Sequence, residues 1–297
     1  MSEKPFVITP VYDILLRGSL YMPMGLFHLQ IVTAEQLCRL HYKPGCIKAV
    51  KARLKNLAEA GYVQHDVIPS REFRRPYYYT LGTKGVRYLR QTGLDIDDTF
   101  RASKEVNKHS LFVEHALELN DVIIAAALLK GTDSGYYLHS FIHERTLRRK
   151  PYKATWRVNG RQEAISLIPD ALLNFQCFDG QRQMRFPVLL EHDRGTEGQH
   201  HFRQRIRAYL TFLKDEGPQK LFGTQAVTIA FTTFAGEFRL AQMRKWARQE
   251  LTQHNSRFGQ TFVFANFVRP LEPRTMWLEP VWRVAYEDQP PVALLAL

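Results

Sequence analysis

Three carboxylates stand where short apolar segments end, a position from which acidic side chains can hold a metal ion. Asp170 closes the segment Ile168-Pro169-Asp170, and Glu191 and Asp193 follow the apolar run Val188 to Leu190. Carboxylates beside a buried strand are costly unless they bind a positive group. Because carboxylate oxygens suit Mg²⁺ or Mn²⁺, the pattern predicts a divalent-metal site made of these three residues.

A β-hairpin would bring the three carboxylates together. Phe178-Asp179-Gly180 is a turn signal between two apolar arms, at about residues 164–176 and 185–192. Side chains alternate between the two faces of a strand. We therefore expect Glu191 and Asp193 to share one face, while His192 takes the other face and has a structural role.

The string Pro169-Asp170 with Glu191-x-Asp193-Arg194-Gly195-Thr196-Glu197 resembles the replication-relaxation family of plasmid and mobile-element proteins. The carboxylates also resemble the motif of the PD-(D/E)xK nuclease superfamily. The resemblance covers about residues 10–285. It implies a winged helix followed by a metal-dependent DNA endonuclease domain, in which Glu144 matches an upstream acidic position of the family.

One position departs from the superfamily pattern, because Asp193 stands where Lys is usual. An arginine of the next helix could replace that lysine in space, and Arg205 is the catalytic candidate among Arg203, Arg205 and Arg207. Arginine stays protonated, so it can clamp a phosphate but is a poor base. Of the adjacent His200 and His201, at most one should face the site, since neighbouring helical positions point about 100° apart.

The charge of the chain favours a polyanionic partner. Lys and Arg number 41 against 29 Asp and Glu, which gives a formal net charge of +12. From Arg39 to Arg90 there are 12 basic and 3 acidic residues, so this one segment carries +9 of the total. We interpret this concentration of charge as a binding surface for double-stranded DNA.

The same segment predicts a winged helix-turn-helix. Helices are expected at about residues 11–20, 33–41 and 46–60, the second opened by a capping box that starts at Thr33. Two strands, about 62–67 and 77–81, would follow and enclose a basic tip. In a winged helix one helix enters the major groove and the hairpin touches the backbone. The predicted DNA-binding residues are Lys48, Lys51 and Lys55 on the third helix and Arg71, Arg74 and Arg75 at the tip.

The remaining periodicities predict an α+β or α/β fold with a restriction-endonuclease-like core. A helix at 109–129, a strand at 136–143, the two hairpin arms, a helix at 196–214 and a strand at 225–231 give the order αβββαβ. A further helix at 237–252 and strand at 261–268 follow. We expect a winged-helix domain at 1–94 and a nuclease-like domain at 95–297.

Composition indicates a cytoplasmic protein without a membrane segment. The longest apolar run has eight residues, Val122 to Leu129, and the three cysteines are scattered. The expected partners are double-stranded DNA and either a second copy of the chain or other replication and mobilisation proteins. Two alternatives to an endonuclease are a silent nuclease fold that only binds DNA and a winged-helix transcriptional regulator.

Overall fold

The computed structural model describes residues 9–10, 22–68, 76–94, 96, 100–106, 108–132, 135–149, 151–158, 161–179, 182–254, 257–286 and 288–295. The predicted first helix and the three arginines of the predicted tip, Arg71, Arg74 and Arg75, lie outside these residues. The chain forms two compact units, one of Thr9–Leu128 and one built mainly of Leu129–Leu297. The domain boundary expected after residue 94 stays a prediction.

The N-terminal unit combines helices with a three-stranded antiparallel sheet of order β2-β4-β3. Its capping box is confirmed: the Gln36 backbone N–H donates to Thr33 Oγ1, and the Thr33 N–H donates to Gln36 Oε1, both at 3.1 Å. Its elements are β1 (Thr9–Pro10), α2 (Met22–Leu29), β2 (Val32–Thr33), α3 (Ala34–His41), α4 (Ile47–Glu59), β3 (Val63–Val67), β4 (Tyr77–Leu81), α5 (Thr83–Gln91), η1 (Ala102–Lys104) and α6 (Ser110–Leu128).

Buried polar groups join α6 to the rest of this unit. Gln36 Nε2 donates to the Leu117 carbonyl at 2.7 Å and to Asp121 Oδ1 at 3.0 Å. Asn120, which is fully buried, donates to the Leu29 carbonyl at 2.9 Å and also to the Ile31 carbonyl. Because α6 satisfies backbone groups of this unit, the compact units divide after α6.

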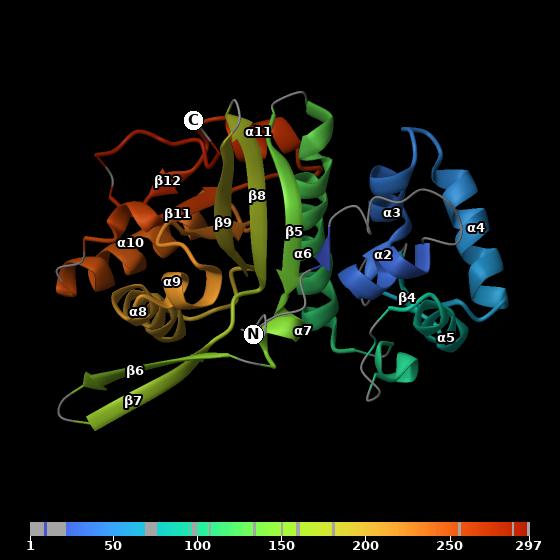
Figure 1. Ribbon diagram of the computed structural model, residues 1–297, viewed down its shortest axis with the longest axis horizontal. Helices are drawn as coiled ribbons and strands as arrows, with labels where there is room; N and C mark the ends of the chain where they lie inside the picture. Colours follow the sequence, from blue (N-terminus) through green and yellow to red (C-terminus); the bar gives the residue numbers. More distant parts are fainter. Residues whose placement is uncertain are drawn as a thin grey trace. The chain divides into compact units, whose positions relative to one another are not determined.

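The C-terminal unit contains a mixed sheet in which the order from β5 onward is β5-β8-β9-β10-β11-β12 (Figure 1). The strands β5, β8 and β9 are antiparallel, and β9, β10 and β11 are parallel. Its elements are η2 (Leu129–Thr132), β5 (Tyr137–His143), α7 (Glu144–Leu147), β6 (Tyr152–Val158), β7 (Arg161–Leu167), β8 (Ala171–Asp179), β9 (Arg182–Asp193), α8 (Gln199–Lys214), α9 (Gly217–Phe222), β10 (Thr228–Thr233), α10 (Glu237–Gln253), η3 (Gly259–Thr261), β11 (Phe262–Asn266), α11 (Pro273–Leu278) and β12 (Arg283–Val284).

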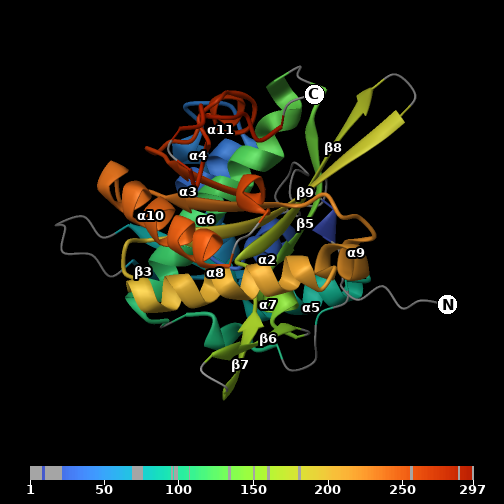
Figure 2. The same ribbon diagram turned by 90° about the vertical axis from the view of Figure 1, so that its left-hand side faces the viewer.

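The helices α8 and α10 cover one face of this sheet (Figure 2). Phe202 of α8 and Met243 of α10 are fully buried with Leu189, Phe231 and Phe264 of the strands. This apolar layer fixes both helices, and so it fixes the polar side chains that they carry at the edge of the sheet.

The expected hairpin is confirmed, but the bounds predicted for its first arm are wrong. Asp179 pairs with Arg182 across the turn, so β8 and β9 form the hairpin. The expected arm at 164–176 is broken at Ile168–Asp170, where Pro169 has no backbone N–H to donate to a neighbouring strand. Residues before this break belong to β7, which pairs with β6 in a separate two-stranded ribbon that we did not predict from the sequence.

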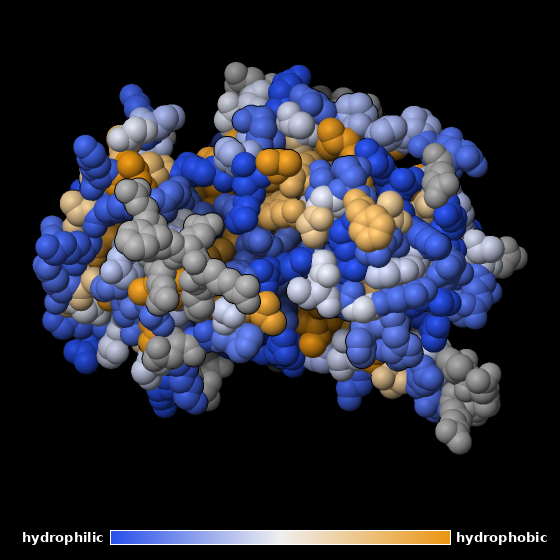
Figure 3. Space-filling model, turned by 180° about the vertical axis from the view of Figure 1, so that it is seen from behind, coloured by the Kyte–Doolittle hydropathy of each residue, from blue (hydrophilic) through white to orange (hydrophobic). Residues whose placement is uncertain are grey.

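Among the described residues, no helix is both long and apolar enough to cross a bilayer. On the face in Figure 3, apolar residues lie in small patches between hydrophilic ones.

Candidate functional site

One edge of the main sheet brings together most of the acidic residues predicted from the sequence. The strand β5 ends, β8 begins and β9 ends at this edge, since His143 pairs with Ala171 and Ala171 pairs with Leu190. The backbone N–H of Glu144 donates to the Asp170 carbonyl at 2.9 Å. We call this end of the three strands, which carries the side chains of Glu144, Asp170, Glu191 and Asp193, the carboxylate edge.

Asp170 and Glu191 are neighbours at the carboxylate edge. The Asp170 carboxylate accepts a hydrogen bond of 2.7 Å from the backbone N–H of His192. Asp170 directly precedes Ala171 and Glu191 directly follows Leu190, and Ala171 and Leu190 pair across the hairpin, so the register places the two acids next to each other. The roles predicted for Asp170 and Glu191 remain predictions, but the fold places the two residues as the hairpin required.

Glu191 is buried and bound by two side chains of α8. Its Oε2 accepts a bond of 2.8 Å from Arg205 Nη1, and its Oε1 accepts one of 2.6 Å from the Tyr209 hydroxyl. Burial raises the pKa of Glu191 to about 8, although the Arg205 guanidinium opposes this rise. Burial likewise raises the pKa of Tyr209 well above its ordinary value.

Asp193 is bound by an arginine of α10. Arg239 Nε and Nη2 donate to the two Asp193 oxygens, each at 2.6 Å, in a bidentate pair. The backbone N–H of Gly195 donates to Asp193 Oδ1 at 2.7 Å. Gly195 has φ +80°, a conformation that favours glycine, and so the turn after β9 itself directs a donor to this carboxylate.

Glu197 connects the two arginines. Arg205 Nη2 donates to Glu197 Oε1 at 2.9 Å, and Arg239 Nη2 donates to the Glu197 carbonyl at 2.8 Å. Burial raises the pKa of Glu197, with Arg205 acting in the opposite direction. A continuous network therefore runs from Glu191 through Arg205 and Glu197 to Arg239 and Asp193.

The strand alternation expected for β9 holds. Glu191 and Asp193 both point to the face covered by α8 and α10, as their arginine partners show. His192 is on the opposite face, where its Nδ1 lies 2.9 Å from Thr232 Oγ1 and its ring packs on Phe234 with centroids 4.7 Å apart.

The other arginines of α8 serve a different carboxylate. Arg203 Nε and Arg207 Nε donate to the two oxygens of Glu250, at 2.6 and 3.1 Å. The Glu250 side chain has no exposed surface. Burial alone would raise its pKa, but the hydrogen bonds from Arg207 and Arg203 together lower it. His200 and His201 are exposed on α8.

The carboxylates in this arrangement do not fit a three-ligand metal site. No group of three or more His, Cys, Asp or Glu side chains in the described part of the chain is arranged to hold a metal ion. The reason is visible in the contacts, since Arg239 occupies both Asp193 oxygens while Arg205 and Tyr209 occupy those of Glu191. The positive groups that buried carboxylates need are here guanidinium groups.

Glu144 is at the carboxylate edge but pairs away from the other acids. It is the first residue of α7, where its carboxylate forms an ion pair with Arg148. No bond joins it to Glu191 or Asp193 in the described contacts. Its assignment to the site rests on its backbone bond to Asp170.

The predicted lysines of α4 lie on the open side of that helix. Val50 and Leu54 are fully buried, whereas Lys48, Lys51 and Lys55 are exposed. Lys51 pairs with Glu35 at 2.9 Å, and its side chain is still 56% exposed. Surface pairs of this kind contribute at most about 1 kcal/mol, so the pair with Glu35 holds Lys51 only weakly.

Sequence reasoning missed three residues that organise the C-terminal unit: Tyr209, Arg239 and Glu250. Tyr209 lies on the apolar face of α8 and looks like an ordinary core residue. Arg239 and Glu250 are on α10, and both are buried. The available signal was indirect: buried carboxylates at the end of β9 require cations, which arginines on flanking helices can supply.

The chain matches the model of a protein family. Neither a curated protein nor a solved structure matches the chain significantly. The family model matches residues 26–226 and is described as replication-relaxation. The matched part contains Asp170, Glu191, Arg205 and Tyr209, whereas Arg239 lies beyond it.

Proposed function

The chain belongs to the replication-relaxation family, and from this premise we propose that it is a DNA-binding protein that acts in the replication or mobilisation of a plasmid or another mobile element. The observation that carries the proposal is the row of exposed lysines on α4, which lies beside the stripe of the buried Val50 and Leu54. A row of cations on a fixed helix face matches the phosphates of duplex DNA.

The arrangement around α4 supports a winged-helix mode of binding. The helix is preceded by α3 and followed by the antiparallel strands β3 and β4, which is the order expected for that fold. In our proposal α4 lies in the major groove, and Lys48, Lys51 and Lys55 contact phosphates that flank it. The predicted tip with Arg71, Arg74 and Arg75 would add contacts to the backbone.

This proposal is tested by measuring duplex binding at several salt concentrations by fluorescence anisotropy. The α4 variant, Lys48→Gln with Lys51→Gln and Lys55→Gln, should bind more weakly and with a flatter salt dependence, by about 0.9 in the log–log slope for each phosphate that is no longer neutralised. The control removes three exposed cations elsewhere, in Lys130→Gln, Lys245→Gln and Arg274→Gln. Equal binding by the α4 variant and the control would contradict the proposal.

Metal-dependent DNA cleavage is the second candidate function. It is favoured by the proximity of Asp170 and Glu191 at the carboxylate edge and by the resemblance to the nuclease superfamily. A cation there would have to displace Arg205 from Glu191, and Asp193 would not be among its ligands. We therefore assign no reaction step to a metal.

The cleavage candidate is decided by incubating the protein with supercoiled plasmid, with and without Mn²⁺. Nicking that requires Mn²⁺ and disappears in Asp170→Asn and Glu191→Gln, while duplex binding remains, would support an endonuclease. Absence of nicking under conditions where the plasmid is bound would leave an accessory DNA-binding protein. Binding confined to promoter sequences would instead favour a transcriptional regulator.

A further inference from the structure

The ribbon of β6 and β7 starts and ends at the carboxylate edge. It occupies the chain between Glu144 and Asp170, whose backbones are joined by the 2.9 Å hydrogen bond. Figures 1 and 2 both show the ribbon extending away from the main sheet. A polymer that passes this edge would therefore meet the ribbon as well.

The part of the chain that runs from Arg145 of α7 through β6 to the start of β7 carries charge of one sign only. Residues 145–161 contain seven basic residues and no acidic one. The basic residues are Arg145, Arg148, Arg149, Lys150, Lys153, Arg157 and Arg161. A run of cations with no acidic residue within it indicates a polyanionic partner.

The inner face of the ribbon is fixed on α8. Ala154 and Leu167 are buried there, and the Arg207 guanidinium lies 5.8 Å from the Trp156 ring centroid. The only acidic residue of β7, Glu163, accepts a 3.0 Å bond from Trp156 Nε1. The ribbon is therefore held in a defined position by its inner face, and the Glu163 carboxylate already accepts a hydrogen bond within the ribbon.

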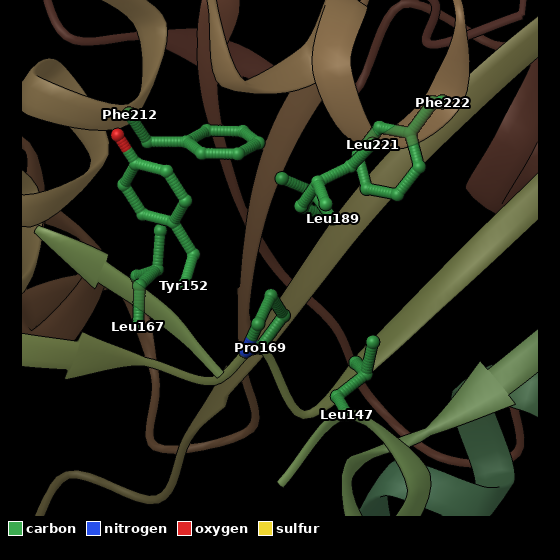
Figure 4. A pocket seen from close by; sticks show the side chains of 8 residues that line it. All are labelled: Leu147, Tyr152, Leu167, Pro169, Leu189, Phe212, Leu221 and Phe222. Carbon is green, nitrogen blue, oxygen red and sulfur yellow. The ribbon is translucent and has the colours of Figure 1, made fainter. Parts of the chain in front are cut away.

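The base of the ribbon is packed without room for a ligand. Tyr152 and Leu167 of the ribbon meet Phe212 of α8 and Leu189 of β9 around a small gap (Figure 4). Its volume is about 20 Å³, enough for one water molecule. This apolar contact anchors the ribbon and is not a binding site.

The outer face of the ribbon carries exposed side chains that are polar or small. Lys153 and Thr155 of β6 are exposed, as are Gln162, Ala164 and Ser166 of β7. Lysine, hydroxyl and amide groups donate hydrogen bonds to phosphate oxygens, and short side chains allow a backbone to approach closely. No carboxylate is among these exposed residues, so nothing on this described face repels phosphate.

We propose that the β6–β7 ribbon, with Arg148 and Arg149 that lead into it, is a second DNA-binding surface that contacts the phosphate backbone of duplex DNA beside the carboxylate edge. This surface belongs to the C-terminal unit and is independent of the lysines on α4. It holds DNA beside the carboxylate edge, whether or not that edge cleaves it. Its affinity comes from charge and not from reading bases.

The test uses the full chain and a fluorescent duplex titrated at several salt concentrations. The ribbon variant is Arg148→Gln with Arg149→Gln and Lys153→Gln, and its matched control is the charge-equivalent Lys130→Gln, Lys245→Gln and Arg274→Gln. If three phosphates are no longer neutralised, the log–log salt slope should be flatter by up to about 2.7, so the fall in affinity between about 50 and 200 mM salt becomes about 40-fold smaller. Thermal melting checks that the ribbon variant is folded.

A single charge reversal keeps the proposal open to refutation if the triple variant is unstable. Lys153→Glu places an acid on the exposed outer face and should weaken duplex binding more than Lys245→Glu does. Salt slopes of the ribbon variant and Lys153→Glu that equal those of their controls would overturn the proposal.

The outcomes also separate this surface from the proposed function of α4. Weaker binding by the ribbon variant with unchanged binding by the α4 variant would support the ribbon and refute the α4 proposal. The reverse result would refute the ribbon alone. Weaker binding by both variants, with the control unchanged, would support two separate DNA contacts.

Discussion

Removing the guanidinium group of Arg239 should strongly destabilise the C-terminal unit. The side chains of Arg239 and Asp193 are only 7% and 3% exposed, and both carboxylate oxygens are held at 2.6 Å. Arg239→Leu would leave the Asp193 carboxylate buried without a counter-charge. Breaking a buried ion pair in this way costs about 3–5 kcal/mol. For a unit of this size, about 2–4 °C per kcal/mol gives a fall in Tm of roughly 6–20 °C.

Scanning calorimetry with a matched exposed pair measures this effect. Arg283 pairs with Glu237 at 2.9 Å, but these side chains are 43% and 61% exposed. Arg283→Leu should therefore cost no more than about 1 kcal/mol. In the double variant Asp193→Leu with Arg239→Leu, much of the stability should return, because no uncompensated charge remains. If Arg239→Leu melted at the same temperature as Arg283→Leu, a stabilising role of the buried Arg239–Asp193 ion pair would be refuted.

Three other substitutions have defined outcomes. Burial raises the folded-state pKa of Glu191 from 4.5 to about 8, so its contribution to stability is full below about pH 4.5 and is lost as the pH rises towards 8. Urea unfolding of Glu191→Gln should therefore show a flatter dependence of stability on pH in this window than the wild type. Parallel curves for the two proteins would contradict the raised pKa of Glu191. Burial opposes ionisation of Glu250, but the bonds from Arg207 and Arg203 lower its pKa below 4.5, so its stabilisation is present above that pH and is lost on acidification. Glu250→Gln should therefore weaken the loss of stability that the wild type shows at acidic pH. An unchanged acid dependence would refute the stabilising role of Glu250. Asn120→Ala removes donors to the Leu29 and Ile31 carbonyls and should cost about 1–3 kcal/mol in the N-terminal unit, and an unchanged unfolding midpoint in urea would count against it.

Local signals predicted the elements that carry the candidate residues. The capping box at Thr33 and Gln36 specified the start of α3, because both partners lie within one helical turn. The apolar spacing of Ile47, Val50, Leu54 and Leu57 predicts the core-facing side of α4. Val50 and Leu54 are fully buried, Ile47 and Leu57 are half-buried, and the lysines are exposed. Alternation along β9 placed Glu191 opposite to His192, since each strand residue reverses the face.

The ribbon was missed although a local signal for it exists. Asn159-Gly160 is a two-residue turn sequence typical of a β-hairpin, and Val158 pairs with Arg161 on either side of it. The apolar residues of β7 run on into Ile168, so the segment was interpreted as the beginning of the next strand. Pro169 decided between the two arrangements, because it cannot donate to a continuous ladder.

The arginine partners of the carboxylates could not be placed from local sequence. Arg239 is on α10, which approaches Asp193 only after β10 has paired in parallel with β9. Nothing within one helical turn distinguishes Arg239 from an arginine on the surface. The buried Glu191 and Asp193 did indicate a need for positive charge. The divalent metal that we expected there stays a prediction, and the structure places the guanidinium groups of Arg205 and Arg239 against these two carboxylates.

The central claim is that α4 contacts DNA, and photo-crosslinking tests it most directly. A benzophenone side chain introduced at Lys51 in the full chain should form a covalent adduct with a bound duplex on irradiation. The same group at Lys130, which is exposed in the other unit, should form little or none. A strong adduct at Lys51 that competes with unlabelled duplex is the predicted result. No adduct at Lys51, under conditions in which anisotropy shows the duplex to be bound, would contradict the account.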